Sequence, residues 1–136
     1  MEDVSPYRVE VRSIDGGPTA LGWAGTVSVV VDRAVAAGGR GLGFNGGQLL
    51  NLAVAGCISN DLFREAAARG IRLTRVRVVA DSDYQGKPAT STPIEYRVEI
   101  SGDASREDLD ELVAHVDAIA EIPNSLRRGT EVTLRM

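Results

Sequence analysis

Little in this 136-residue sequence permits metal or disulfide chemistry, because it holds one cysteine and one histidine. A single cysteine cannot form an internal disulfide, which is typical of a reducing compartment. Four soft ligands for zinc cannot be assembled, and no carboxylate spacing suggests a site for a harder ion. We therefore expect no metal and no cofactor, and we expect a cytoplasmic protein.

Long apolar runs and clustered bases are also missing. No stretch approaches the roughly 20 residues of a membrane-spanning helix, and residues 1–6 have neither the basic nor the apolar region of a signal peptide. The 15 Lys and Arg residues, against 19 Asp and Glu, are spread along a chain of formal net charge −4. Because phosphate contacts need clustered bases, we expect neither nucleic acid nor a membrane as partner.

The 43% of apolar residues is enough for one ordinary domain, which we expect to span residues 1–136. A glycine-rich stretch at 36–47 is a linker by composition, and an apolar stripe behind Ser105 predicts a second helix that ends at Pro123. Alternation of apolar and polar residues predicts strands at 7–12, within 21–32, and at 73–83, 94–101 and 130–136. This order predicts an α+β fold, with an antiparallel sheet packed on a long central helix plus the second helix.

The long central helix is predicted over residues 45–69. Asn45 and Gln48 form a capping-box pattern at its start, and Gly70 stands just past its end. Between residues 49 and 58 the apolar and small side chains leave no polar stripe, and a helix that is apolar on all sides must be covered on all sides. One small sheet covers one side, so we expect a second copy of the chain to cover the other, in a two-fold homodimer. A monomer wrapped by its own terminal strands is the alternative.

Two stretches of the chain resemble the OsmC/Ohr family of thiol-dependent peroxidases. One is Asn45-Gly-Gly-Gln-Leu-Leu-Asn-Leu-Ala-Val-Ala-Gly-Cys57, which is similar to the family's run of small residues leading to a helix cysteine. The other is Ile122-Pro-Asn-Ser-Leu-Arg-Arg-Gly-Thr-Glu-Val-Thr-Leu134, which is similar to the family's Cys-Pro-x-Ser…Gly…Val-Thr-Leu ending. The resemblance implies an OsmC-like fold and an intertwined homodimer with active sites at the subunit interface.

The resemblance places the family's peroxidatic cysteine on Cys57. Its resolving cysteine falls on Ile122, its catalytic glutamate on Gly47, and its catalytic arginine near Gly17-Pro18, and none of these positions keeps the family's residue. The sequence therefore resembles a divergent, single-cysteine branch of the family.

The sequence leaves two interpretations of Cys57 open, a redox residue or a small buried hydrophobe. Cys57 lies about three turns into its helix, beyond the reach of the helix dipole, and Asp61 one turn further on disfavours a thiolate. An activating cation must then come from elsewhere, and Arg40 is our candidate. Asn60 and Asp61 are expected either to line a pocket beside Cys57 or to mark an ordinary helix boundary, and the resemblance adds Ile122 to the expected binding residues.

Our first hypothesis is a one-cysteine peroxidase, in which Cys57 reduces an organic hydroperoxide or hydrogen peroxide. An external thiol would then reduce the resulting sulfenic acid, because the chain has no second cysteine. The alternative is a non-catalytic relative that binds a small hydrophobic molecule at the dimer interface. The matching Cys57 favours the first hypothesis, and the missing glutamate, arginine and second cysteine favour the alternative.

Overall fold

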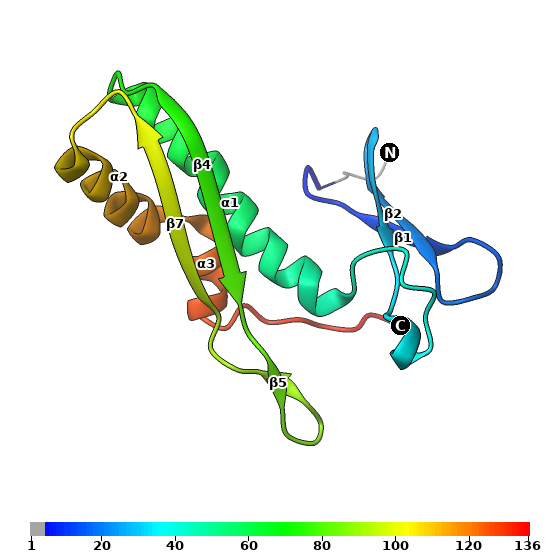
Figure 1. The fold of residues 1–136 in the computed structure, drawn as a ribbon. Coiled ribbons are helices and arrows are strands. Elements are labelled where there is room, and N and C mark those ends of the chain that lie inside the picture. The colour runs from blue at the N-terminus through cyan, green and yellow to red at the C-terminus, as the bar shows by residue number, and fades with distance from the viewer. Residues whose placement is uncertain (1–4) are drawn as a thin grey trace. The chain divides into compact units, whose positions relative to one another are not determined.

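The computed structural model describes residues 5–136 (Figure 1). These residues divide into two compact units, one that ends at Leu50 and one that spans Asn51–Met136. The first unit holds a three-stranded antiparallel sheet in the order β1-β2-β3 and a short 3-10 turn. These elements are β1 (Glu10–Ser13), β2 (Ala20–Ala24), β3 (Val27–Val31) and η1 (Val35–Ala37). The strands confirm the alternation expected within residues 7–12 and 21–32, with shifted ends.

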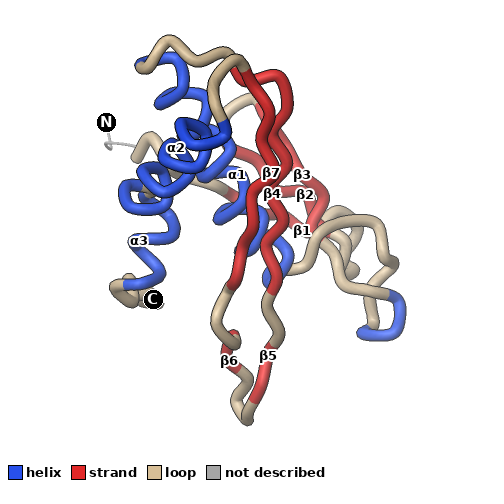
Figure 2. The backbone as a smooth tube through the Cα atoms, turned by 60° about the vertical axis from the view of Figure 1, so that its left-hand side comes forward, coloured by secondary structure: helices blue, strands red, loops and turns tan. Residues whose placement is uncertain are grey.

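The second unit holds most of the long helix, an antiparallel strand pair, a small hairpin and two further helices. They are α1 (Gly46–Ala68), β4 (Leu73–Asp81), β5 (Tyr84–Gln85), β6 (Thr90–Ser91), β7 (Glu95–Gly102), α2 (Arg106–Ile119) and α3 (Glu121–Arg127). The β5–β6 hairpin continues the ribbon formed by β4 and β7 (Figure 2). The fold is α+β with antiparallel strands, as predicted, although among residues 5–136 the strands form three separate sheets rather than one.

The caps of the two predicted helices form as the sequence indicates. At the start of α1, the Asn45 side-chain oxygen accepts from the Gln48 amide at 2.8 Å, and Gln48 Oε1 accepts from the Asn45 amide at 3.0 Å. Gly70 ends the helix with φ +70°, where a side chain is disfavoured. Ser105 Oγ accepts from the Asp108 amide at 3.1 Å and so caps α2.

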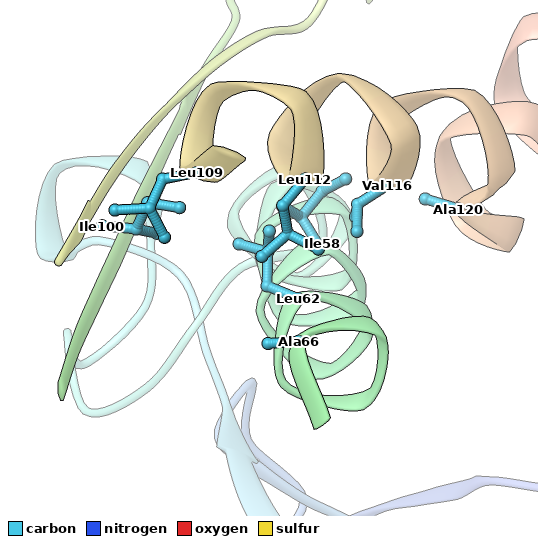
Figure 3. Packing of buried hydrophobic residues seen from close by; sticks show 8 residues of the cluster. All are labelled: Ile58, Leu62, Ala66, Ile100, Leu109, Leu112, Val116 and Ala120. Carbon is cyan, nitrogen blue, oxygen red and sulfur yellow. The ribbon is translucent and has the colours of Figure 1, made fainter. Parts of the chain in front are cut away.

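The core of the second unit lies between α1, α2 and β7 (Figure 3). Its fully or almost fully buried members are Ile58, Leu62, Ala66, Ile100, Leu109, Leu112, Val116 and Ala120. Apolar residues of β4 and β7 pack against this cluster from the sheet side. The amphipathic stripe predicted for α2 therefore points to the core, as periodicity requires.

The glycine-rich stretch is not a free linker, because Asp32 organises it. The Asp32 carboxylate accepts hydrogen bonds from the amides of Arg33, Arg40 and Leu42 and from the Thr19 hydroxyl, at 2.7 to 3.3 Å. Burial alone raises the pKa of Asp32, but these hydrogen bonds outweigh it and hold the pKa below its ordinary value. A buried carboxylate thus takes the place of an apolar core in this loop.

Two predictions for the C-terminal region are wrong. Pro123 does not end α2 but lies at the third position of α3, where its missing N–H removes no helical hydrogen bond. Residues 130–136 alternate as a strand does, yet they form none, and Val132, Leu134 and Met136 are 94%, 81% and 111% exposed. Alternation raises the strand propensity of a segment, but a strand forms only when it pairs with another strand. Among the described residues, residues 130–136 have no strand to pair with.

Candidate functional site

The candidate site is built on the middle of α1. Cys57, the one cysteine of the sequence, is free and partly buried. Its side chain packs at the edge of the apolar core of the second unit. Cys57 is therefore partly accessible to solvent as a residue, while it packs against apolar groups. This position is compatible with either interpretation of Cys57.

Asp61 lies one helical turn after Cys57 and is 7% exposed. Its Oδ1 forms an ion pair with Nη1 of Arg64 at 3.3 Å. Its Oδ2 is buried and has no hydrogen-bond donor among residues 5–136. Burying an oxygen of this kind without a donor is costly, so native proteins keep few such atoms, and those few call for a physical explanation.

The other predicted residues of this unit lie on its surface. Asn60 is exposed on α1, so the expected polar lining beside Cys57 reduces to Asp61. Ile122 is the second residue of α3 and is 37% exposed, outside the core cluster. Among the described residues, no group of three or more His, Cys, Asp or Glu is placed to hold a metal ion.

Arg40 belongs to the first unit and is held there at two points. Its backbone amide donates to Asp32, and its guanidinium binds Asp15 with Nη1–Oδ2 at 3.0 Å and Nη2–Oδ1 at 3.3 Å. The hydrogen bond from Arg40, followed by the amide of Gly17, holds the pKa of Asp15 below its ordinary value. A Cβ atom built on Gly17 would lie 2.9 Å from Nη2 of Arg40.

The guanidinium of Arg40 thus lies against the turn between β1 and β2. This is the part of the first unit where the family resemblance leads one to expect an arginine, near Gly17-Pro18. No local sequence pattern indicates this arrangement, because Arg40 and Asp15 lie 25 positions apart. The sequence analysis also missed Asp32, whose carboxylate holds the backbone amide of Arg40. The one feature that could have indicated this role is the position of Asp32 between a predicted strand and a glycine-rich stretch.

Two further polar pairs in the second unit join elements without offering a nucleophile. His115 Nε2 lies 2.7 Å from Oε1 of Glu65 and links α2 to α1. Asp117 Oδ1 accepts from the Tyr96 hydroxyl and, at 2.7 Å, from Nη2 of Arg127. Burial, reinforced by Asp117, raises the pKa of Tyr96, so its hydroxyl stays a donor at neutral pH.

Tyr96 and Asp117 also line a shallow groove of about 440 Å³ between β7 and α2. Its charged lining is already matched, because Arg106 binds Asp110 at 3.0 Å and Asp117 is held by Tyr96 and Arg127. The charged groups of this groove therefore already have partners, whereas Oδ2 of Asp61 has none among residues 5–136.

Fold and site together define a class: a small α+β protein with one thiol on a long capped helix. The family model described as OsmC-like protein matches residues 38–135. The chain belongs to the OsmC family. No curated protein matches the chain, and no helix among residues 5–136 is long and apolar enough to cross a membrane.

Solved structures of this family share the fold at low sequence identity. An OsmC-like protein from Mycoplasma pneumoniae superposes with a TM-score of 0.77 at 16% identity, over 93% of this chain and 89% of the other. An organic hydroperoxide resistance protein OsmC from Legionella pneumophila gives 0.64 at 17% identity, over 91% and 92% of the two chains. The organic hydroperoxide resistance protein OhrB of Bacillus subtilis gives 0.60 at 20% identity, over 90% of each. At these identities the likeness shows the fold alone.

Proposed function

We propose that this protein is a one-cysteine peroxidase that reduces an organic hydroperoxide or hydrogen peroxide. The proposal is supported by Cys57, a free and partly buried cysteine on a helix of the family's fold, at the position where the sequence resemblance places the peroxidatic cysteine. Two structures with this fold are named organic hydroperoxide resistance proteins, which supports the same substrate class.

The reaction needs no internal partner for Cys57. The sulfur attacks the terminal oxygen of the hydroperoxide, the S–O bond forms as the O–O bond breaks, and the thiol becomes a sulfenic acid. The departing alkoxide takes the proton that the thiol lost and leaves as the alcohol. An external thiol then displaces water from the sulfenic acid to give a mixed disulfide, and a second thiol releases Cys57 in its reduced form.

Arg40 remains our proposal for the cation that favours the Cys57 thiolate, because its guanidinium stands at the turn where the family resemblance calls for an arginine. Replacement by methionine keeps an unbranched, flexible stem and removes the charge. We expect the R40M variant to react with hydroperoxide on the order of tenfold more slowly than the wild type. An unchanged rate would remove Arg40 from the site.

We further propose that the protein is a homodimer joined along α1. Val54 and Ile58 are buried on one side of this helix, but Leu52 and Phe63 on another side are 47% and 51% exposed. Residues 52, 56, 60 and 63 recur at helical spacing and share a face, and Gly56 leaves room on it for close approach. The chain thus buries only one side of α1. We propose that the same helix of a second copy packs against the exposed side.

A thiol-coupled peroxidase assay tests the function. We expect the wild type to consume cumene hydroperoxide in the presence of a small thiol, and Cys57→Ser to lose activity by on the order of a hundredfold or more. A matched control is Ser59→Ala, two residues away on the same helix, which should keep the wild-type rate. A wild type no more active than Cys57→Ser would overturn the proposal and favour the alternative, a non-catalytic protein that binds a small hydrophobic molecule at the dimer interface.

A further inference from the structure

The C-terminal segment, residues 130–136, has the sequence pattern of a strand but no strand beside it. Its apolar residues Val132, Leu134 and Met136 alternate with polar ones and are 94%, 81% and 111% exposed. We propose that the C-terminal segment of one copy adds as an antiparallel strand to the edge of β1 in a second copy, with Val132 opposite Val11. The inference rests on the proposed homodimer and adds a contact distinct from the one along α1.

β1 offers an edge that can pair in this way. The sheet of the first unit has the order β1-β2-β3, so β1 pairs with β2 on one side and has no strand on its other side among residues 5–136. All four residues of β1 are exposed. An edge strand leaves backbone N–H and C=O groups unpaired, and an extended segment of another chain satisfies them with main-chain hydrogen bonds.

The other strand edges are less suitable. The Phe44 amide donates to the Val30 carbonyl at 3.0 Å, and the Asp32 amide donates to the Phe44 carbonyl at 2.9 Å, so the glycine-rich stretch already lies along β3. Apolar residues of the β4–β7 ribbon pack on the core, and among residues 5–136 no exposed large apolar side chain lies on either strand. β1 is therefore the edge where an added apolar strand covers exposed apolar surface.

One face of the β1–β2–β3 sheet is apolar. A Cβ atom built on Gly22 would lie 3.5 Å from the side chains of Val11, Val29 and Val31, so these valines share a face. Val27 alternates with Val29 onto the same face. Val11 and Val27 are 56% and 68% exposed. A strand that adds to β1 with apolar residues on this face would extend it and cover its edge.

The alternation of the C-terminal segment fits this face. Directly opposite residues of an antiparallel pair lie on the same face of the sheet. With Val132 opposite Val11, Leu134 is opposite Val9, which directly precedes β1 and is 70% exposed. A shift of one residue would turn the apolar residues of the segment to the other face. The pattern therefore restricts the pairing to registers two residues apart.

The charges on the other face distinguish these registers. With Val132 opposite Val11, Glu131 is opposite Arg12, a favourable pair of opposite charges. In this chain Arg12 Nε also lies 2.5 Å from Oε2 of Glu10. A shift of two residues that brings Glu131 opposite Glu10 would oppose two carboxylates. Arg135 is opposite Arg8 in the proposed register, but Arg8 lies before β1 and is exposed, so these side chains can separate into solvent.

Disulfide trapping tests the pairing in a chain whose Cys57 is replaced by Ser. One protein carries Val11→Cys, and a second, labelled with a heavy nitrogen isotope, carries Val132→Cys. The two are mixed, left to exchange subunits and oxidised, and mass spectrometry identifies disulfides between labelled and unlabelled chains. Thr133→Cys in place of Val132→Cys is the matched control, because adjacent residues of a strand point to opposite faces.

We expect the mixed disulfide to form on the order of tenfold more with Val132→Cys than with Thr133→Cys, since Cβ atoms of opposite residues lie about 4.5 to 5.5 Å apart, near the reach of a disulfide. Hydrogen exchange of the wild type gives a second measurement without any substitution. The amides of residues 131–135 should exchange on the order of tenfold more slowly where the protein is dimeric than after dilution to single chains.

The outcomes separate this inference from the homodimer on which it rests. Sedimentation equilibrium that finds only single chains at the concentration used for trapping refutes both. A dimer in which Val132→Cys and Thr133→Cys trap equally, or in which the amides of 131–135 stay unprotected, refutes the pairing and leaves the contact along α1. A single chain carrying both Val11→Cys and Val132→Cys that forms the disulfide at the mass of one chain also refutes it, because the segment then pairs with its own β1.

Discussion

The two units of the chain are stabilised in different ways. The second unit has a continuous apolar core, in which Leu62 and Leu112 from different helices are both completely buried. The first unit buries Thr19, Ala20 and Asp32, and its β1–β2–β3 sheet leaves Val11 and Val27 56% and 68% exposed. Apolar burial is the dominant stabilising contribution in most domains, so the second unit has the means to be stable by itself.

This difference suggests that the first unit depends on polar contacts and on further cover. Asp32 fixes its loop through hydrogen bonds, which add little net free energy each but specify one conformation. Exposed apolar strands and the exposed side of α1 are the kind of surface that association covers. In the homodimer that we propose, the second unit is a folded platform and the remaining exposed apolar surface finds its partner on another copy.

The largest effect is expected from a cavity in the second unit. Leu62→Ala removes a side chain that is 0% exposed and should lower the free energy of unfolding by about 3 to 4 kcal/mol. Leu52→Ala on the same helix, at 47% exposure, is the matched control and should cost less than about 1.5 kcal/mol in the protomer. Urea denaturation at low protein concentration measures both, and equal losses would contradict the account of the core.

The next effect tests the exposed side of α1. Phe63→Glu places a charge on a residue that is 51% exposed in the single chain and, in the proposed dimer, is covered by the second copy. We expect the dimer to weaken by about 3 kcal/mol, or on the order of a hundredfold in its dissociation constant, while the protomer stays folded. Sedimentation equilibrium measures the change. A dissociation constant equal to that of the wild type would place the interface elsewhere.

A smaller effect is expected from the loop of the first unit. A Cβ atom on Gly43 would lie 2.2 Å from the Val30 carbonyl oxygen, so Gly43→Ala forces the loop away from β3. We expect a loss of about 2 kcal/mol and faster hydrogen exchange of the Leu42 and Phe44 amides, with the second unit unaffected. Gly46→Ala is the control, because nothing lies within 4 Å of its Cβ position. Protection unchanged in Gly43→Ala would show that the close approach is not needed.

The smallest effect concerns the link between α1 and α2. The hydrogen bond from His115, and then that from Arg64, hold the pKa of Glu65 below its ordinary value of 4.5. A lowered pKa stabilises the folded chain above that ordinary value, and the gain is lost as the pH falls through the folded pKa. Glu65→Gln should therefore flatten the pH dependence of stability below about pH 4.5, where thermal unfolding measures it. An unchanged slope would mean that the pair contributes nothing.

Prediction from sequence succeeded where local rules decide the outcome. The capping box of Asn45 and Gln48, the glycine at position 70 and the stripe of α2 follow from helix geometry and need no knowledge of the rest of the chain. It failed where a distant partner decides. The alternation at 130–136 predicted a strand but named no neighbour for it. Pro123 predicted the end of a helix, yet proline is also tolerated in the first turn of a new helix, and that is its place in α3.

The site shows the same division. The position of Asp61 one turn after Cys57 was readable from the sequence, because both lie on one helix. The burial of its Oδ2, and the pairing of Arg40 with Asp15, depend on contacts between distant segments. Family resemblance predicted the fold and offered Cys57 as the candidate redox residue, but it gave no information on these contacts.

The most direct test of the proposed peroxidase function is whether the Cys57 sulfur reacts with a peroxide. The intact protein, reduced and then treated with one equivalent of cumene hydroperoxide, is examined by mass spectrometry. We predict one added oxygen atom, located on Cys57, trapped by a sulfenic acid reagent and removed by a small thiol. A protein whose mass does not change, while its thiol is still titratable after unfolding, would contradict the account.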